Sequence, residues 1–320
     1  MKIDLYSEKF FRRFGLLTVY SIFFLIFVGG WVRVTGSGMG CPDWPKCFDQ
    51  WVPPTELSDL PEDYKERFKR GSHEVADFNV FHTWTEYVNR LVGVLIGLFI
   101  AITMVSSFQF RKTEPKITVY AVLSFVLVGF QGWIGKVVVD KNLAGWMVTI
   151  HMLIALVVVA MVMLAVFRHA APKSSIDGQN SLRNLSMIAL VLTLIQITVG
   201  TQVRERVDEV LIHQLAPNWI DHAGSVLRSH VILSFLLMGV IIALWYQAKK
   251  GLRNEGGLKK VLNITLLFSL IQILSGIANR WMDLPAISQM SHILFGTLMA
   301  GGFYYLWMVL NRKSTSQEVL

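Results

Sequence analysis

Histidines within long apolar stretches of this sequence could bind a metal ion or the iron of a haem. His230 and His292 lie in two such stretches, on alternate predicted helices and at matching depth. Two imidazoles that face each other across a four-helix bundle suit axial ligation of a haem iron. A zinc site would need further cysteine or carboxylate ligands, which these two helices do not offer. Taken singly, each histidine has the alternative of a hydrogen-bonded core residue.

An internal repeat relates these histidines to a second set of residues. A shift of 141 residues superposes three pairs: Gln131 with Gln272, Gly135 with Gly276, and His151 with His292. The same shift takes His230 to Asn89. The spacing Gln-x-x-x-Gly occurs once more, at 196–200. Residues from about 82 to 167 and about 223 to 308 are therefore two copies of one unit. Small residues at the glycine positions would let neighbouring helices pack closely.

The first copy carries a carboxylate that the second copy lacks. Glu86 stands where the shift of 141 gives Leu227. On a helix, His82, Glu86 and Asn89 share one face, because they are spaced by four and then three residues. One interpretation is a polar helix end in which Glu86 pairs with Arg90. The other is a reactive site next to a cofactor, in which Glu86 handles protons.

The chain has two cysteines, and both lie in the segment TGSGMGCPDWPKC at 35–47. Cys41 and Cys47 enclose five residues, and the prolines between them restrict the chain, so a disulfide is geometrically feasible. Such a bond is stable only in an oxidising compartment. The pair is either a structural link for the loop at 35–80 or a redox-active or cofactor-handling pair, and spacing alone does not distinguish the two.

The elements that position these residues are predicted to be membrane-spanning helices. Of 320 residues, 53% are hydrophobic and 16% are charged, whereas soluble domains carry roughly 25% charged residues. Each charge-free stretch reaches the ~18 residues of a spanning helix. Two helices, those around 91–110 and 229–248, should start earlier, in polar first turns. The eight stretches are 14–32, 91–110, 117–135, 142–167, 184–203, 229–248, 261–279 and 284–311.

The basic residues predict the orientation. They concentrate in the N-terminal segment, in every second loop and at the C-terminal end, and such segments remain on the cytoplasmic side. Both termini are therefore expected in the cytoplasm, and the 35–80 loop on the outer face. The net charge of +8 is explained by this asymmetry, so no nucleic-acid partner is expected. No cleavable signal peptide is expected either, because the first apolar stretch is too long.

The predicted fold class is an all-α integral membrane protein with eight transmembrane helices in two pseudo-symmetric four-helix bundles. Residues 1–171 form the first bundle, with the long outer loop at 35–80. Residues 172–183 form a cytoplasmic linker, and residues 184–320 form the second bundle.

The sequence resembles the haem A synthases, the cytochrome oxidase assembly family. The segment at 35–47 resembles the first outer loop of the family, and WTEYVNRLVG at 84–93 resembles its Glu-x-x-His-Arg motif. Eight helices in two similar halves also match, as do the histidines of the fourth, sixth and eighth helices. The resemblance covers nearly the whole chain.

The resemblance implies oxidation of the C8 methyl of haem O to a formyl group, through a hydroxymethyl intermediate, to give haem A. It implies a haem b ligated by His230 and His292 in the second half. It places the substrate haem in the first half with His151, and gives Glu86 the catalytic role. It links Cys41 and Cys47 to haem delivery or redox work. Arg90 and other arginines near the outer boundary could pair with haem propionates.

One position departs from the family pattern, since Asn89 stands where the motif has histidine. Asparagine is a poor iron ligand. We therefore expect His151 as the protein ligand of the first site, with His82 as an alternative second ligand. Asn89 could instead hydrogen-bond a water or oxygen species.

The resemblance and the topology also predict the surroundings of the protein. We expect a multi-pass protein of a bacterial-type cytoplasmic (inner) membrane, surrounded by lipid, with its haem sites toward the outer face. A haem O donor such as a haem O synthase and an electron acceptor of unknown identity are the expected partners, and a homo-oligomer is an open alternative. Two rival functions are a dihaem b-type electron-transfer cytochrome and a haem chaperone or transporter.

Overall fold

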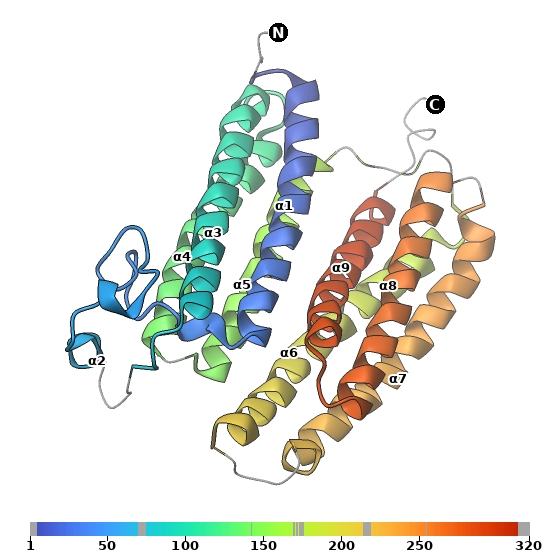
Figure 1. Cartoon of the computed structure of the whole chain (residues 1–320). Helices are drawn as coiled ribbons and strands as arrows, with labels where there is room; N and C mark the ends of the chain where they lie inside the picture. The colour runs from blue at the N-terminus through green and yellow to red at the C-terminus, as the bar shows by residue number, and fades with distance from the viewer. Residues whose placement is uncertain are drawn as a thin grey trace. The chain divides into compact units, whose positions relative to one another are not determined.

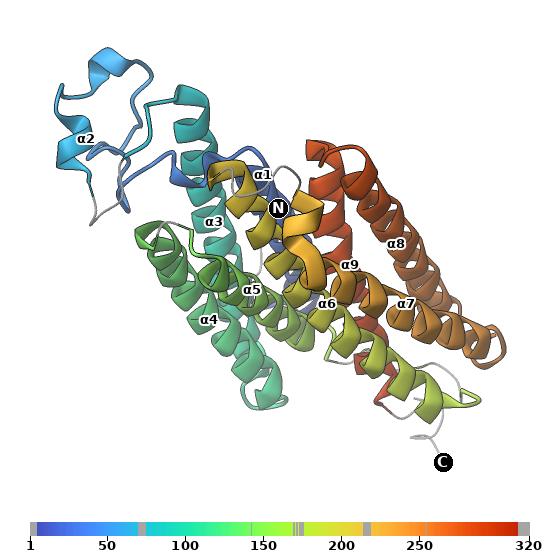
Figure 2. The ribbon, with the colours of Figure 1, turned by 90° about the horizontal axis from the view of Figure 1, so that it is seen from below.

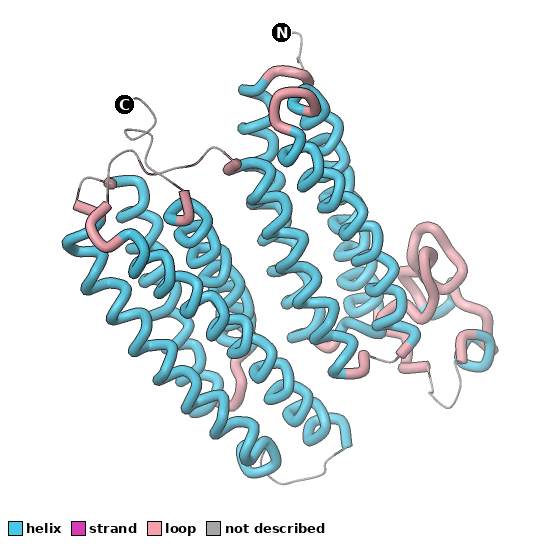
Figure 3. Tube along the Cα trace, turned by 180° about the vertical axis from the view of Figure 1, so that it is seen from behind, coloured by secondary structure: helices cyan, strands magenta, loops and turns pink. Residues whose placement is uncertain are grey.

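The computed structural model describes residues 5–69, 75–141, 143–168, 170, 172, 176–213, 219–253 and 255–312. Within these ranges the chain is helical and forms no strand (Figure 3). Eight helices of this part are long and apolar enough to cross a membrane, as the sequence predicts. They are α1 (Glu8–Val34), α3 (Val80–Ser107), α4 (Pro115–Asp140), α5 (Gly145–Val166), α6 (Gln179–His213), α7 (Trp219–Gly251), α8 (Gly256–Trp281) and α9 (Ala286–Leu310).

Short elements complete the fold. A 3-10 turn, η3 (Phe108–Phe110), ends α3. The segment between α1 and α3 contains the 3-10 turns η1 (Ser37–Met39) and η2 (Leu57–Asp59) and the short helix α2 (Tyr64–Arg67).

Local sequence signals explain where the long helices begin. The side chain of Asn79 caps α3 by accepting a hydrogen bond from the backbone N–H of His82 at 3.2 Å, as expected of an N-cap residue. Pro115 occupies the first turn of α4, where its missing N–H costs nothing. Both α3 and α7 start before their charge-free stretches, so the predicted polar first turns are confirmed.

The chain divides into two compact units, Met1–Val166 and Phe167–Leu320. In the first unit α1, α3, α4 and α5 form a closed ring in which each helix packs on two neighbours (Figure 1). In the second unit α6, α7, α8 and α9 form a ring with the same order of neighbours. The predicted linker at 172–183 differs at its end, since α6 already begins at Gln179.

Within each unit, many apolar side chains on the helices point outward from the unit's own core. Val94, Val126 and Phe235 are examples, with exposed fractions of 64%, 60% and 72%. A water-soluble protein rarely leaves so many large apolar groups uncovered. Together with the eight spanning helices, these exposed faces indicate a multi-pass membrane protein whose outward surfaces meet lipid.

The loop between α1 and α3 forms a small body of its own beside the start of α3 (Figure 2). Its core contains the two cysteines, Phe48, Leu60 and Tyr64. Tyr87 of α3 packs against this core from the helix side. The loop therefore has its own apolar centre, anchored on the end of the helix that carries Glu86.

Candidate functional site

The cysteine hairpin, residues 40–47, is closed by a disulfide. The Sγ atoms of Cys41 and Cys47 are 2.03 Å apart, and both residues are fully buried. The predicted link between the two cysteines is therefore present. Whether it also has a redox role stays a prediction.

Glycine lets the hairpin approach α3 backbone to backbone. A Cβ atom on Gly40 would lie 2.3 Å from the carbonyl oxygen of His82, a distance that no side chain tolerates. The hydroxyl of Thr83 donates to the carbonyl of Gly40 at 2.9 Å. The indole of Trp84 donates to the carbonyl of Pro54 at 3.2 Å. The first turns of α3 therefore hold the loop between α1 and α3 directly through its backbone.

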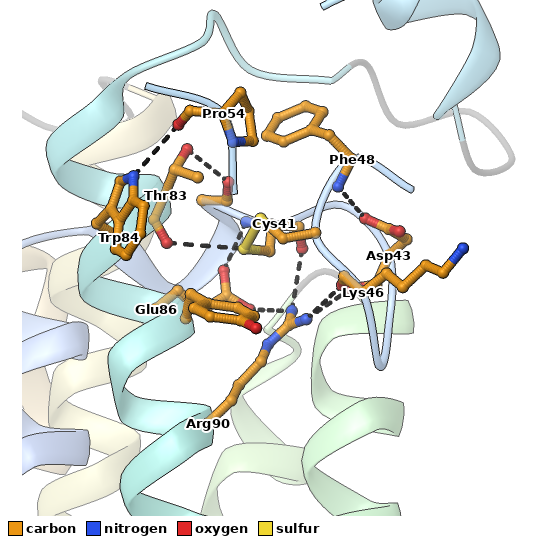
Figure 4. The surroundings of a disulfide bond; sticks show 12 residues. Cys41, Asp43, Lys46, Phe48, Pro54, Thr83, Trp84, Glu86 and Arg90 are labelled. Carbon is orange, nitrogen blue, oxygen red and sulfur yellow. Dashed lines mark hydrogen bonds and ion pairs between the residues drawn. A yellow bond between two sulfur atoms is a disulfide. The ribbon is translucent and has the colours of Figure 1, made fainter. Parts of the chain in front are cut away.

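Glu86 lies beneath this hairpin, with only 3% of its surface exposed (Figure 4). One carboxylate oxygen accepts a hydrogen bond from the backbone N–H of Cys41 at 2.8 Å. The other forms an ion pair with Arg90, one helical turn further along α3. The pairing of Glu86 with Arg90 that the sequence suggested is therefore confirmed, and the N–H of Cys41 adds a second contact.

Arg90 also binds the hairpin itself. Its Nη1 donates to the carbonyls of Asp43 and Lys46 at 2.7 and 3.0 Å, and its Nη2 donates to the carbonyl of Cys41 at 3.2 Å. Figure 4 shows the guanidinium directed into the turn of the hairpin. A planar guanidinium with several fixed donors suits such a cluster of acceptors. Arg90 thus joins the carboxylate to the hairpin, and its pairing with a propionate stays a prediction.

The second unit brings its two predicted ligands together. His230 on α7 and His292 on α9 belong to helices that lie diagonally across the ring, and their ring centroids are 6.1 Å apart. Imidazole nitrogens bind metal ions at about 2 Å, so two rings that share one iron need centroids about 6 Å apart. The observed separation fits a haem iron between them. His222, by contrast, pairs with Glu209 at 2.7 Å.

Each predicted histidine ligand rests against a glycine of the preceding helix. A Cβ atom on Gly200 or Gly276 would lie 3.2 Å from the Cε1 atom of His230 or His292, respectively. For Gly135 and His151 the corresponding distance is 3.5 Å. Glycine therefore leaves room for an imidazole at three places in the chain, which explains the repeated glycine.

The glutamine of the Gln-x-x-x-Gly repeat contacts the same histidines. The side-chain amide of Gln131 donates to the carbonyl of His151 at 2.7 Å. Gln196 does the same to the carbonyl of His230 at 2.8 Å. In these two copies glutamine fixes the backbone of the histidine and glycine accommodates its ring. In the third copy the backbone carbonyl of Gln272 lies 3.0 Å from the Nδ1 of His292.

The first unit has His151 but no histidine at the position that corresponds to His230. This position holds Asn89, whose side-chain oxygen is buried without a hydrogen-bond partner among the described residues. His82 is engaged elsewhere, since its Nδ1 lies 2.9 Å from the hydroxyl of Ser37. His151 and Asn89 belong to helices that lie diagonally across the ring, as the two histidines do in the second unit.

Comparison with known proteins places the chain in a family. A family model described as "Cytochrome oxidase assembly protein" matches residues 12–301. The chain belongs to this family. Relatives named Heme A synthase are 23% identical in Flavobacterium johnsoniae, Wolbachia pipientis wMel and Geobacillus thermodenitrificans. The alignments cover 89%, 92% and 95% of this chain and 93%, 91% and 93% of the relatives, in that order.

Several contacts of the site could not be predicted from the sequence. The bond between Glu86 and the N–H of Cys41 joins residues 45 positions apart, and no pattern in the chain signals it. The contact of Ser37 with His82 is equally distant in sequence. The repeated Gln-x-x-x-Gly spacing marks the glutamines in the sequence. Only their contacts with the histidines show what these side chains do.

The disulfide yields a prediction about stability and activity. Protein purified without reductant should show Cys41 and Cys47 resistant to alkylation, as mass spectrometry would report. Replacing both by alanine should loosen the hairpin but leave partial activity, because Arg90 and Gly40 still hold it to α3. Two freely alkylated thiols would contradict the disulfide, and complete loss of activity in a folded double variant would favour a redox role.

Proposed function

We propose that this chain is a haem A synthase, a membrane oxidoreductase that converts haem O to haem A. The C8 methyl of the substrate becomes a formyl group through a hydroxymethyl intermediate. Membership of the family and three relatives of that name, aligned over most of their length, support the assignment. The structural observation that supports it most strongly is the burial of the Glu86 carboxylate, at the end of the bundle that also contains His151.

The second unit would hold a haem b between His230 and His292. The separation of the two rings and the glycines behind them support this placement. A haem held by both histidines would supply electron transfer, because its iron would have two protein ligands and no position left for substrate. Gln196 holds the backbone at His230 and keeps that ring in place.

The first unit would bind the substrate, with His151 as the protein ligand of its iron. Oxidation of the methyl to the hydroxymethyl group takes its oxygen atom from a water molecule and releases two electrons and two protons. Oxidation of the hydroxymethyl to the formyl group releases two more of each, and the electrons pass to the separate acceptor. Glu86 is a group in this unit suited to take up a proton, and its carboxylate is held in place by the Cys41 N–H and the Arg90 guanidinium. A carboxylate fixed in this way can act as a general base without reorganising.

The arrangement of the sites implies a route for substrate and electrons. We place both termini in the cytoplasm and both haem sites toward the outer face of a bacterial-type inner membrane. A haem O synthase is the natural donor of the substrate, and the electron acceptor is a separate molecule. The contacts of the hairpin with α3 put it beside Glu86, in a position to cover the substrate.

Asn89 gives the first site a specific prediction. With His151 as the single protein ligand, the iron of bound haem should be high-spin and should bind added cyanide. The Asn89→His variant should convert the spectrum toward low spin, because it adds the imidazole that the repeat has at His230. His82 is the alternative second ligand, although its Nδ1 contact with Ser37 ties it to the loop.

Absorption and electron paramagnetic resonance spectra of the haem-loaded protein check this prediction, with His82→Ala as the matched variant. A wild-type first site that is already low-spin and stays so in His82→Ala would refute both ligand assignments.

Extraction of the bound haems tests the proposed function against its rivals. A dihaem electron-transfer cytochrome would contain haem b alone, whereas a synthase supplied with haem O should also yield haem O and haem A. A chaperone would release unmodified haem from both units. Detection of haem A in the extract supports the proposal, and haem b as the sole pigment under haem O supply would refute it.

A further inference from the structure

The imidazole of His292 is held in one tautomer. Its Nδ1 lies 3.0 Å from the backbone carbonyl of Gln272 and 3.1 Å from the hydroxyl of Ser275. A carbonyl oxygen can only accept a hydrogen bond, so Nδ1 carries the proton. The other ring nitrogen, Nε2, then has the free lone pair that an iron ligand needs.

The other two histidines of the repeat lack such a hydroxyl partner. Among the described residues, the Nδ1 atoms of His151 and His230 make no hydrogen bond to a side chain, although the backbone of Gln196 still interacts with the ring of His230. The missing hydroxyl is explained by the residue before the glycine, which is Ser275 next to His292 but Ile134 and Val199 in the other two copies. An apolar side chain at that position offers no hydroxyl to the ring.

The positions of the two rings in the second unit are otherwise alike. A Cβ atom on Gly276 would lie 3.6 Å from the Nδ1 of His292, and one on Gly200 would lie 3.7 Å from the Nδ1 of His230. A serine at position 199 would therefore place its hydroxyl near the Nδ1 of His230, as Ser275 does for His292.

We propose that Ser275 is a positioning residue that makes the two axial ligands of the haem in the second unit unequal. Its hydroxyl donates to the carbonyl of Gln272 at 3.1 Å and accepts from the Nδ1–H of His292. The hydroxyl of Ser288 donates to the carbonyl of Ser275 at 2.8 Å, which ties α9 to α8 beside the ring. Hydrogen bonding at Nδ1 orients a ligating histidine and raises its basicity. His292 becomes the stronger donor to oxidised iron. This inference rests on the proposed haem b site.

A reciprocal pair of variants tests it. Ser275→Val copies the α6 sequence into α8 and should raise the midpoint potential of the haem, because oxidised iron loses donation from His292. Haem affinity should fall about tenfold, at the lower end of the losses caused by removing a hydrogen-bond partner of a ligating histidine. The loss stays small because the backbone carbonyl of Gln272 can still accept from Nδ1. Val199→Ser should lower the midpoint potential, because it gives His230 a hydroxyl partner.

Ser269→Val is the control, because Ser269 is a similarly buried serine of α8 whose hydroxyl bonds Thr265 and Met299.

Spectroelectrochemical titration of the purified, haem-loaded protein gives the readout. Shifts of opposite sign in the two variants, with none in the control, support the inference. Unchanged potentials in both variants, or a shift in the control as large as that in Ser275→Val, would overturn it. Wild-type protein without any low-spin b-type spectrum would instead refute the haem b site and thus the proposed function.

Discussion

The Glu86→Gln variant should fold and bind haem but form almost no haem A. Glutamine keeps the shape of the side chain and can still accept the hydrogen bond from the Cys41 N–H. It cannot take up a proton, and loss of a general base costs about 10²–10⁴-fold in rate. Chromatography of the haems formed from haem O measures the loss directly.

The hairpin itself provides the control for this variant. If Glu86 served only to hold the loop, Glu86→Gln would loosen the hairpin in proportion to the lost activity. Limited proteolysis between residues 48 and 60 should instead proceed at the wild-type rate. Glu86→Ala, which removes the acceptor as well, should both loosen the loop and abolish activity. Normal haem A yield from Glu86→Gln would exclude the catalytic role.

Replacing either His230 or His292 by alanine should remove the low-spin haem b spectrum. Each variant deletes one of two imidazoles whose rings lie 6.1 Å apart, so the iron loses an axial ligand. Haem in the first unit should persist, because His151 lies in the other compact unit. Reduced-minus-oxidised spectra of the purified variants separate the two haems.

His222→Ala is the matched control, because this histidine lies on the same helix as His230 and pairs with Glu209. It should keep a normal b-type spectrum. A normal spectrum in His230→Ala or in His292→Ala would show that the ligands are assigned wrongly.

The long helices and the proximity of His230 to His292 could be predicted because both depend on local or periodic signals. Charge-free stretches determine which segments can cross a membrane. The shift of 141 residues marks His292 and His151 as equivalent. The last ten residues of α6, 204–213, were not predicted as part of the helix, since charged residues such as Arg204 suggest the end of a span. The helix continues there to His213, supported by the ion pair of Arg204 with Asp208 at 2.8 Å.

The contacts that join Glu86 and Arg90 of α3 to the hairpin could not be predicted from the sequence, for a physical reason. Glu86 and Arg90 are neighbours on a helix surface, so their pairing follows from spacing. Their contacts with Cys41, Asp43 and Lys46 depend instead on how a loop of more than forty residues folds back. The approach of Gly40 to the backbone of His82 likewise joins distant parts of the chain and is visible only in the folded structure.

Conversion of haem O is the most direct test of the account. The chain is expressed beside a haem O synthase in cells that make no haem A of their own, and the extracted haems are separated by chromatography. We expect haem A, with the hydroxymethyl form as a minor product, and neither from cells that carry Glu86→Gln. Haem O and haem b without haem A, from wild-type protein that is folded and present in the membrane, would contradict the account.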